Sequence, residues 1–205
     1  MDKSSTVKKH VQETFVRKAG LAAAVVDFSP DMHSTLALAL DLCLKKDIRD
    51  VFASEDPSQS SPAGEKIIAA PGLEDEYVRR LSKMCASNAV RVLTSGLNHH
   101  PGGIDLGLTH ADWGIAETGT LVVNTDSEDK RLAGMISEVH VNILPESRIV
   151  ADSFDLEKRL GKCFASAPAY TSFITGPSRT ADIERELTLG VHGPLELYIL
   201  ILRGA

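Results

Sequence analysis

Residues 170–202, YTSFITGPSRTADIERELTLGVHGPLELYILIL, contain two apolar segments with most of the polar motifs of the chain between them. The first segment, 170–175, is rich in β-branched and aromatic residues and stops at Gly-Pro-Ser (176–178), as a strand does when it ends at a turn. The second segment, 195–202, is a continuous apolar run and predicts another buried strand. We therefore expect two strands to hold the polar motifs between them.

Hydroxyl and acidic residues follow the Gly-Pro-Ser turn. Ser178, Thr180 and Asp182 suit the start of a helix, where the first backbone N–H groups lack partners. A strand that leads through a glycine turn into a helix start predicts an anion site. Arg179 adds a guanidinium, which can bind a carboxylate or phosphate through two hydrogen bonds. The same residues also fit a capped helix start without a ligand.

His192 lies in Gly-Val-His-Gly-Pro (190–194), where the two glycines allow a backbone or a ligand to come close. An imidazole with a pKa near 6.5 suits the removal of a hydroxyl proton. A lone histidine also serves as a structural hydrogen-bond donor, so the motif leaves both roles open.

Composition excludes several classes of protein. The net charge of −6 and pI near 5.6 disfavour binding to nucleic acid or to an anionic membrane. The apolar runs are shorter than the roughly 20 residues of a spanning helix. The polar first residues lack the apolar core of a secretion signal, so we expect a cytoplasmic protein. Cys43, Cys85 and Cys163 have no cluster-forming spacing, and we expect buried, reduced thiols without bound zinc or iron–sulfur clusters.

The rest of the chain alternates between helical and strand patterns. The expected elements are an amphipathic helix over 1–20, a strand at 21–28, a helix from a cap at Ser29-Pro30-Asp31 to 46, strands at 50–53 and 67–70, a helix at 73–89, strands at 90–94 and 121–124, a helix at 129–136, strands at 139–144 and 149–151, and a helix from 152 or 153 to 163. This alternation predicts a single α/β domain over 21–205, with a mostly parallel central sheet flanked by helices. Sites in such sheets lie at the carboxyl ends of the strands.

A second polar block, Ala-Glu-Thr-Gly-Thr (116–120), precedes the expected strand at 121–124. We expect Glu117 to hydrogen-bond the turn near 175–182 or a ligand, or to cap a local turn. The histidines His99, His100, His110 and His140 lack the spacing of metal ligands, so no metal site is predicted. No GxGxxG or Walker pattern occurs, which disfavours the usual nicotinamide and ATP enzymes.

Three blocks of sequence resemble a known family. GIAETGTLVV (114–123) and ITGPSRTADIERELTLGVHGP (174–194) are similar to the LUD domain of the lactate utilization protein C family. RLAGMISEVHVNILPESRIVADSFD (131–155) also resembles that family, in which a helix leads to a strand carrying a histidine. The resemblance implies the α/β fold grouped with sugar-phosphate isomerases and CoA transferases. It also implies a role beside iron–sulfur subunits in the oxidation of L-lactate to pyruvate, with no cofactor in this chain.

The site residues follow from the motifs and the resemblance together. We expect a ligand-binding site built from Thr118, Gly119, Thr120, Gly176, Pro177, Ser178, Arg179, Thr180, Asp182 and Gly193, with Glu117 and His192 as catalytic candidates. The first hypothesis is a non-redox subunit or accessory factor that binds a small anionic ligand or its partner subunits. The alternative is a stand-alone enzyme that acts on a CoA ester, phosphorylated or carboxylate substrate through Glu117 and His192. A purely structural role and homo-oligomer formation are left open.

Overall fold

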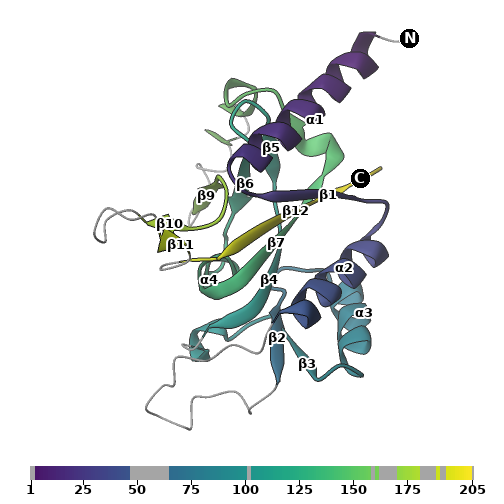
Figure 1. Cartoon of the computed structure of the whole chain (residues 1–205), viewed down its shortest axis with the longest axis vertical. Helices are drawn as coiled ribbons and strands as arrows, with labels where there is room; N and C mark the ends of the chain where they lie inside the picture. The colour runs from purple at the N-terminus through teal and green to yellow at the C-terminus, as the bar shows by residue number, and fades with distance from the viewer. Residues whose placement is uncertain are drawn as a thin grey trace.

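The computed structural model describes residues 3–46, 65–100, 103–157, 160–161, 170–180, 188–189 and 193–204. In this part of the chain, six parallel strands form the central sheet in the order β1-β12-β7-β4-β2-β3 (Figure 1). These strands are β1 (Val25–Ser29), β2 (Lys66–Ala69), β3 (Val90–Leu93), β4 (Ile104–His110), β7 (Ser137–Pro145) and β12 (Glu196–Leu202). The predicted α/β class with a mostly parallel sheet is confirmed.

A second, four-stranded sheet and a short ribbon complete the β structure described. The second sheet has the order β8-β5-β6-β9, and the ribbon pairs β10 with β11. Their bounds are β5 (Trp113–Ile115), β6 (Thr120–Asn124), β8 (Ile149–Val150), β9 (Thr171–Ile174), β10 (Arg179–Thr180) and β11 (Thr188–Leu189). The helices are α1 (Lys3–Leu21), α2 (Met32–Lys45), α3 (Asp75–Cys85) and α4 (Glu128–Ile136), with 3₁₀ turns η2 (Leu97–His99), η3 (Glu146–Arg148) and η4 (Phe154–Leu156).

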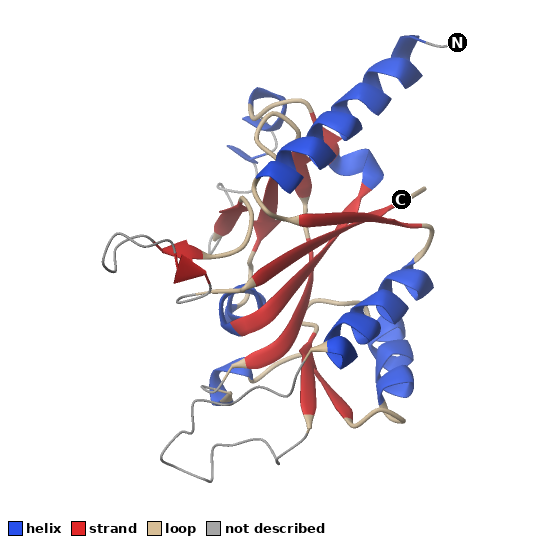
Figure 2. Ribbon diagram, viewed as in Figure 1, coloured by secondary structure: helices blue, strands red, loops and turns tan. Residues whose placement is uncertain are grey.

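Helices cover both faces of the central sheet, as Figure 2 shows. On one face, α2 and α3 share a core with the alternate residues Val139, Val141 and Ile143 of β7. On the other face, α1 packs on β12 and on the second sheet through a core that includes Phe15 and Leu121. Each such buried aliphatic side chain contributes about 2 kcal/mol. The strands between these layers are therefore buried on both sides, as expected for a parallel sheet.

Side chains alternate between the two faces of the sheet along β7, so polar residues lie on the face opposite α2 and α3. Because Val139, Val141 and Ile143 face α2 and α3, the intervening His140 and Asn142 point to the opposite side. His140 lies against α4 there, since a Cβ added to Gly134 would come within 3.1 Å of its Cε1 atom. This face of the sheet therefore combines an apolar core with a small group of buried polar residues.

Two glycine turns of the second sheet contact the end of α1. Gly119 and Gly176 have φ values of +70° and +75°, which favour glycine. A Cβ added at Gly119 would overlap the backbone of Ala19, and one at Gly176 would overlap the carbonyl of Ala22. Glycine is thus required at both turns for the conformation and for the close approach to α1.

Several predicted elements differ from those observed. The N-cap of α2 is Asp31, whose side chain accepts a hydrogen bond from Ser34 N at 2.8 Å, so the expected cap at Ser29 is wrong. The predicted helix from 152 or 153 begins instead with the 3₁₀ turn η4. The predicted strand at 50–53 lies outside the described residues. Cys43 and Cys85 are buried as expected, whereas Cys163 lies outside the described part. No described helix has both the length and the apolar character needed to cross a membrane.

The turn at Gly119 gives a prediction for stability. Gly119→Ala should lower the free energy of unfolding by at least about 2 kcal/mol, because the new Cβ requires a strained φ and displaces the backbone of α1. Gly20→Ala is the matched control, since an added Cβ there meets nothing within 4 Å. Urea unfolding of both variants checks this. Equal stabilities would show that the contact between the turn and α1 is absent.

Candidate functional site

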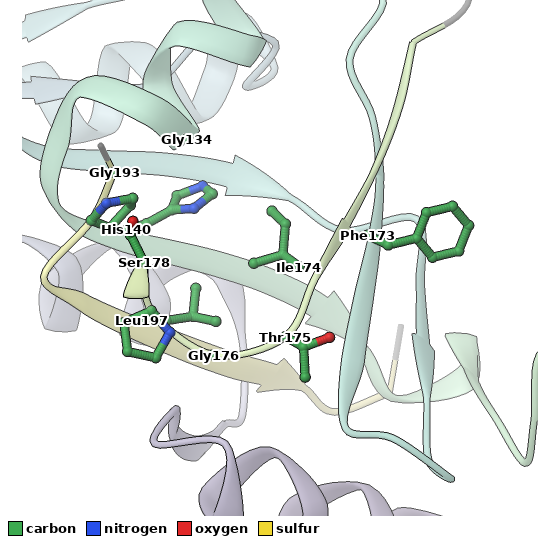
Figure 3. A pocket seen from close by; sticks show the side chains of 11 residues that line it. Gly134, His140, Phe173, Ile174, Thr175, Gly176, Ser178, Gly193 and Leu197 are labelled. Carbon is green, nitrogen blue, oxygen red and sulfur yellow. The ribbon is translucent and has the colours of Figure 1, made fainter. Parts of the chain in front are cut away.

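A pocket of about 260 Å³ lies among α4, the first half of β7, the start of β12 and the segment from β9 to β10 (Figure 3). Its lining residues are Gly134, His140, Phe173, Ile174, Thr175, Gly176, Pro177, Ser178, Gly193, Pro194 and Leu197. In Figure 3, His140, Ser178 and Gly193 lie at one end and the side chain of Phe173 points away at the other. The pocket does not lie at the carboxyl ends of the central strands, where sites were expected.

Backbone contacts join the two blocks of sequence that form most of this pocket. Ser178 N donates to the Pro194 carbonyl at 2.9 Å, and Leu195 N donates to the Glu138 carbonyl at 2.8 Å. Gly193 allows the close approach, because an added Cβ would lie 2.9 Å from the Cβ atom of Ser178. These contacts bring the predicted residues Gly176, Pro177, Ser178 and Gly193 into one pocket.

His140 is the buried polar side chain of the pocket, with 2% of its surface exposed. The Thr109 hydroxyl lies 2.9 Å from His140 Nε2 and donates to Asn142 Oδ1 at 3.0 Å. A threonine hydroxyl carries one proton, so once it donates to Asn142 it can only accept from the ring. With the Thr109 proton on the Asn142 side, Nε2 of His140 is the protonated nitrogen and Nδ1 is the unprotonated one.

Burial keeps this imidazole neutral. Desolvation lowers the pKa of His140 from 6.5 to about 4, because the charged ring would lose its hydration. At pH 7 the ring is thus a weak base that still offers a hydrogen-bond acceptor. Among the described lining residues none carries a formal charge. The pocket therefore offers neutral polar groups, chiefly His140, Ser178 and Thr175, beside apolar walls.

The predicted block at 117–120 lies next to this pocket but does not line it. Thr118 Oγ1 lies 2.7 Å from Thr120 Oγ1, which lies 2.7 Å from Thr175 Oγ1. This chain of hydroxyls reaches the pocket at Thr175. Glu117 is exposed, is absent from the pocket lining, and donates its backbone N–H to the Ala151 carbonyl at 3.0 Å.

The expected helix start after Ser178 is wrong at its first residues. Arg179 and Thr180 form β10, which pairs antiparallel with β11, and Ser178 N is already bonded to Pro194. Strand pairing satisfies these groups, so a helix N-terminus with free N–H groups does not form at Ser178. The Arg179 guanidinium instead donates to the Ala22 carbonyl at 2.8 Å, beyond the end of α1. Asp182, His192 and the side chain of Thr180 lie outside the described residues.

Sequence reasoning predicted Ser178 but missed His140 and the residues around it. The family resemblance includes a histidine on this strand and the spacing disfavours His140 as a metal ligand, but neither assigns His140 to the pocket, and Thr109, Asn142 and Gly134 were not predicted as site residues. The alternation in SEVHVNILP (137–145) was the available signal, because it places His140 and Asn142 on one face opposite the valines. In the part of the chain that the structure describes, no group of three His, Cys, Asp or Glu side chains could hold a metal ion.

Comparisons with known proteins give a family and a fold. The LUD domain family model matches residues 13–202. Lactate utilization protein C 1 of Bacillus mycoides is 37% identical over 101 residues, which is 48% of this chain and 43% of that protein. Lactate utilization protein C of Halalkalibacterium halodurans is 34% identical over 101 residues, covering 48% and 44%. The chain thus spans less than half the length of the curated relatives that it matches.

A solved structure has the same fold. The crystal structure of a DUF162 family protein from Deinococcus radiodurans aligns with a TM-score of 0.60 and covers 95% of this chain and 98% of that chain. The sequence identity is 14%, so this likeness concerns the fold alone.

Burial of His140 predicts a pH dependence of stability. Its pKa is about 4 in the native state and near 6.5 in the unfolded chain, so between these values the unfolded state binds the extra proton. Acidification from pH 6.5 to pH 4 should therefore remove about 3 kcal/mol of stability through this group. Urea unfolding at several pH values checks it. His140→Gln should flatten the profile, while the exposed His33→Gln should not; identical profiles for all three proteins would contradict a buried neutral His140.

Proposed function

Because the chain belongs to the LUD domain family, we propose that it is a component of lactate utilization and that its pocket binds a small anionic ligand of the lactate type. The pocket itself is the observation that supports ligand binding. Its volume of about 260 Å³ lies below the range for drug-sized ligands and suits a small metabolite. Lactate has a carboxylate, a hydroxyl and a methyl group, which match the polar and apolar parts of the lining.

The polar groups of the pocket support recognition of a carboxylate by neutral donors. Ser178 and Thr175 each supply a hydroxyl that can donate to a carboxylate oxygen, and hydrogen bonds to a charged acceptor are stronger than those to a neutral one. Ile174 and Leu197 supply apolar surface for a methyl group. Arg179 is held at Ala22, so in this arrangement the hydroxyls, and not the guanidinium, serve the ligand.

We propose that this chain is a cytoplasmic component of the lactate-oxidising system and carries no redox centre itself. Its three cysteines lack cluster-forming spacing, so the electrons of lactate oxidation pass through iron–sulfur subunits that it accompanies. The resemblance of residues 114–123 and 174–194 to the lactate utilization protein C family implies this division of roles. The alternative, an enzyme acting through Glu117 and His192, draws no support from the pocket, because Glu117 does not line it.

Ser178 provides the test of ligand binding. The purified chain should bind L-lactate, and Ser178→Ala should weaken this binding about tenfold, since one hydrogen bond to a charged group is lost. Calorimetric titration measures both affinities. Ser172→Ala is the matched control, because Ser172 is a half-buried serine of β9 outside the pocket. Equal loss in both variants, or no binding by the wild-type chain, would refute a lactate site here.

Reconstitution tests the non-redox role. The chain alone should not reduce a dye with L-lactate as donor, whereas its addition to iron–sulfur subunits should increase their lactate-dependent dye reduction. Glu117→Gln should leave that increase unchanged, because Glu117 is exposed and outside the pocket. Turnover by the isolated chain that Glu117→Gln abolishes would establish the enzyme alternative instead.

A further inference from the structure

The tautomer of His140 determines which kind of ligand group the ring can bind. In this tautomer, Nε2–H of His140 donates to the Thr109 hydroxyl, and that hydroxyl donates its own proton to Asn142 Oδ1. The ring therefore presents only one unprotonated nitrogen, Nδ1, and this nitrogen can only accept a hydrogen bond while the ring is neutral. A neutral acceptor is the wrong partner for a carboxylate oxygen and the right partner for a hydroxyl.

Asn142 does not occupy the acceptor direction of Nδ1. Its Nδ2 atom lies 3.3 Å from Nδ1 and 3.2 Å from Nε2 of His140. An atom almost equally distant from both ring nitrogens cannot lie along the in-plane lone pair of either one. The amide thus lies over the ring, and no other polar partner of Nδ1 occurs in the part of the chain described. Because His140 lines the pocket, a ligand there can supply the missing donor.

The surroundings of His140 favour this role over proton transfer. Gly134 packs against the ring, Leu197 lies opposite it in the sheet, and the pocket lining that the structure describes contains no charged side chain. With a pKa of about 4, the ring would hold a proton in roughly one molecule in a thousand at pH 7. Orientation of a donor is therefore the chemistry that this histidine can provide.

We propose that His140 Nδ1 accepts a hydrogen bond from the ligand's hydroxyl, so that the pocket selects a small 2-hydroxy carboxylate over the same acid without the hydroxyl. Thr109 is a positioning residue in this arrangement, because its hydroxyl fixes which nitrogen is the acceptor. Ser178 and Thr175 remain for the carboxylate. The assignment rests on the proposed function for its ligand class, but the tautomer can be measured without any ligand.

The experiment compares L-lactate with propionate, which has the carboxylate and carbon chain but no hydroxyl. The wild-type chain should bind L-lactate about tenfold more tightly than propionate, as one hydrogen bond contributes. Thr109→Val should abolish this preference by removing the hydroxyl that fixes the ring, while Thr109→Ser should restore it. Nitrogen NMR of the His140 ring should show the Nε2–H form in wild type and Thr109→Ser, and a changed tautomer balance in Thr109→Val.

Each of the other possible results would contradict one specific element of this proposal. Equal binding of the two acids by wild type would overturn the hydroxyl contact while leaving the anion site intact. Binding of neither acid would refute the proposed ligand class and this assignment with it. An Nδ1–H tautomer in the free chain would overturn the assignment on its own. L-lactate affinity that rises about tenfold per pH unit from pH 7 to pH 6 would show that a protonated His140 pairs with the carboxylate instead.

Discussion

The parallel register between β12 and β7 is the constraint on which the pocket depends. In this register Leu197 lies opposite His140, and the turn before β12 meets Ser178. Apolar residues occupy both faces of β12, so its hydrophobic pattern alone does not fix the register. Polar contacts at the start of the strand supply that information: Leu195 N bonds to Glu138, and the Glu196 carboxylate pairs with Lys46 of the α2 C-cap.

A cluster of buried polar groups can be stable in such a core when each group has a partner. The hydroxyl of Thr109 links Nε2 of His140 to the Asn142 carbonyl between an apolar sheet and α4. The low dielectric that strengthens these bonds also keeps the ring uncharged. The described lining of the pocket thus presents neutral donors and acceptors and no charged side chain.

Periodic patterns in the sequence predicted the architecture, and local signals predicted parts of the site. Alternating helices and strands gave the α/β class, and the Gly-Pro-Ser and Gly-Pro motifs identified four pocket residues. The helix expected after Ser178 was wrong at its start, because capping residues such as Ser and Thr also suit strand ends and turns. His140 could not be assigned to the pocket from its neighbours in sequence, since Thr109 and Gly134 meet it only through the sheet and α4.

The segment from Thr175 to Arg179 is attached to two separate parts of the molecule. Gly176 and Arg179 contact Ala22, which directly follows α1, and Ser178 bonds to the turn before β12 while also lining the pocket. Displacing α1 would therefore change the shape of the pocket wall formed by residues 176–178. If the pocket binds a ligand as proposed, a molecule that shifts the last turn of α1 would change the affinity for that ligand, and the ligand would change the affinity for that molecule by the same factor. The N-terminal helix would then act as an allosteric element for the pocket.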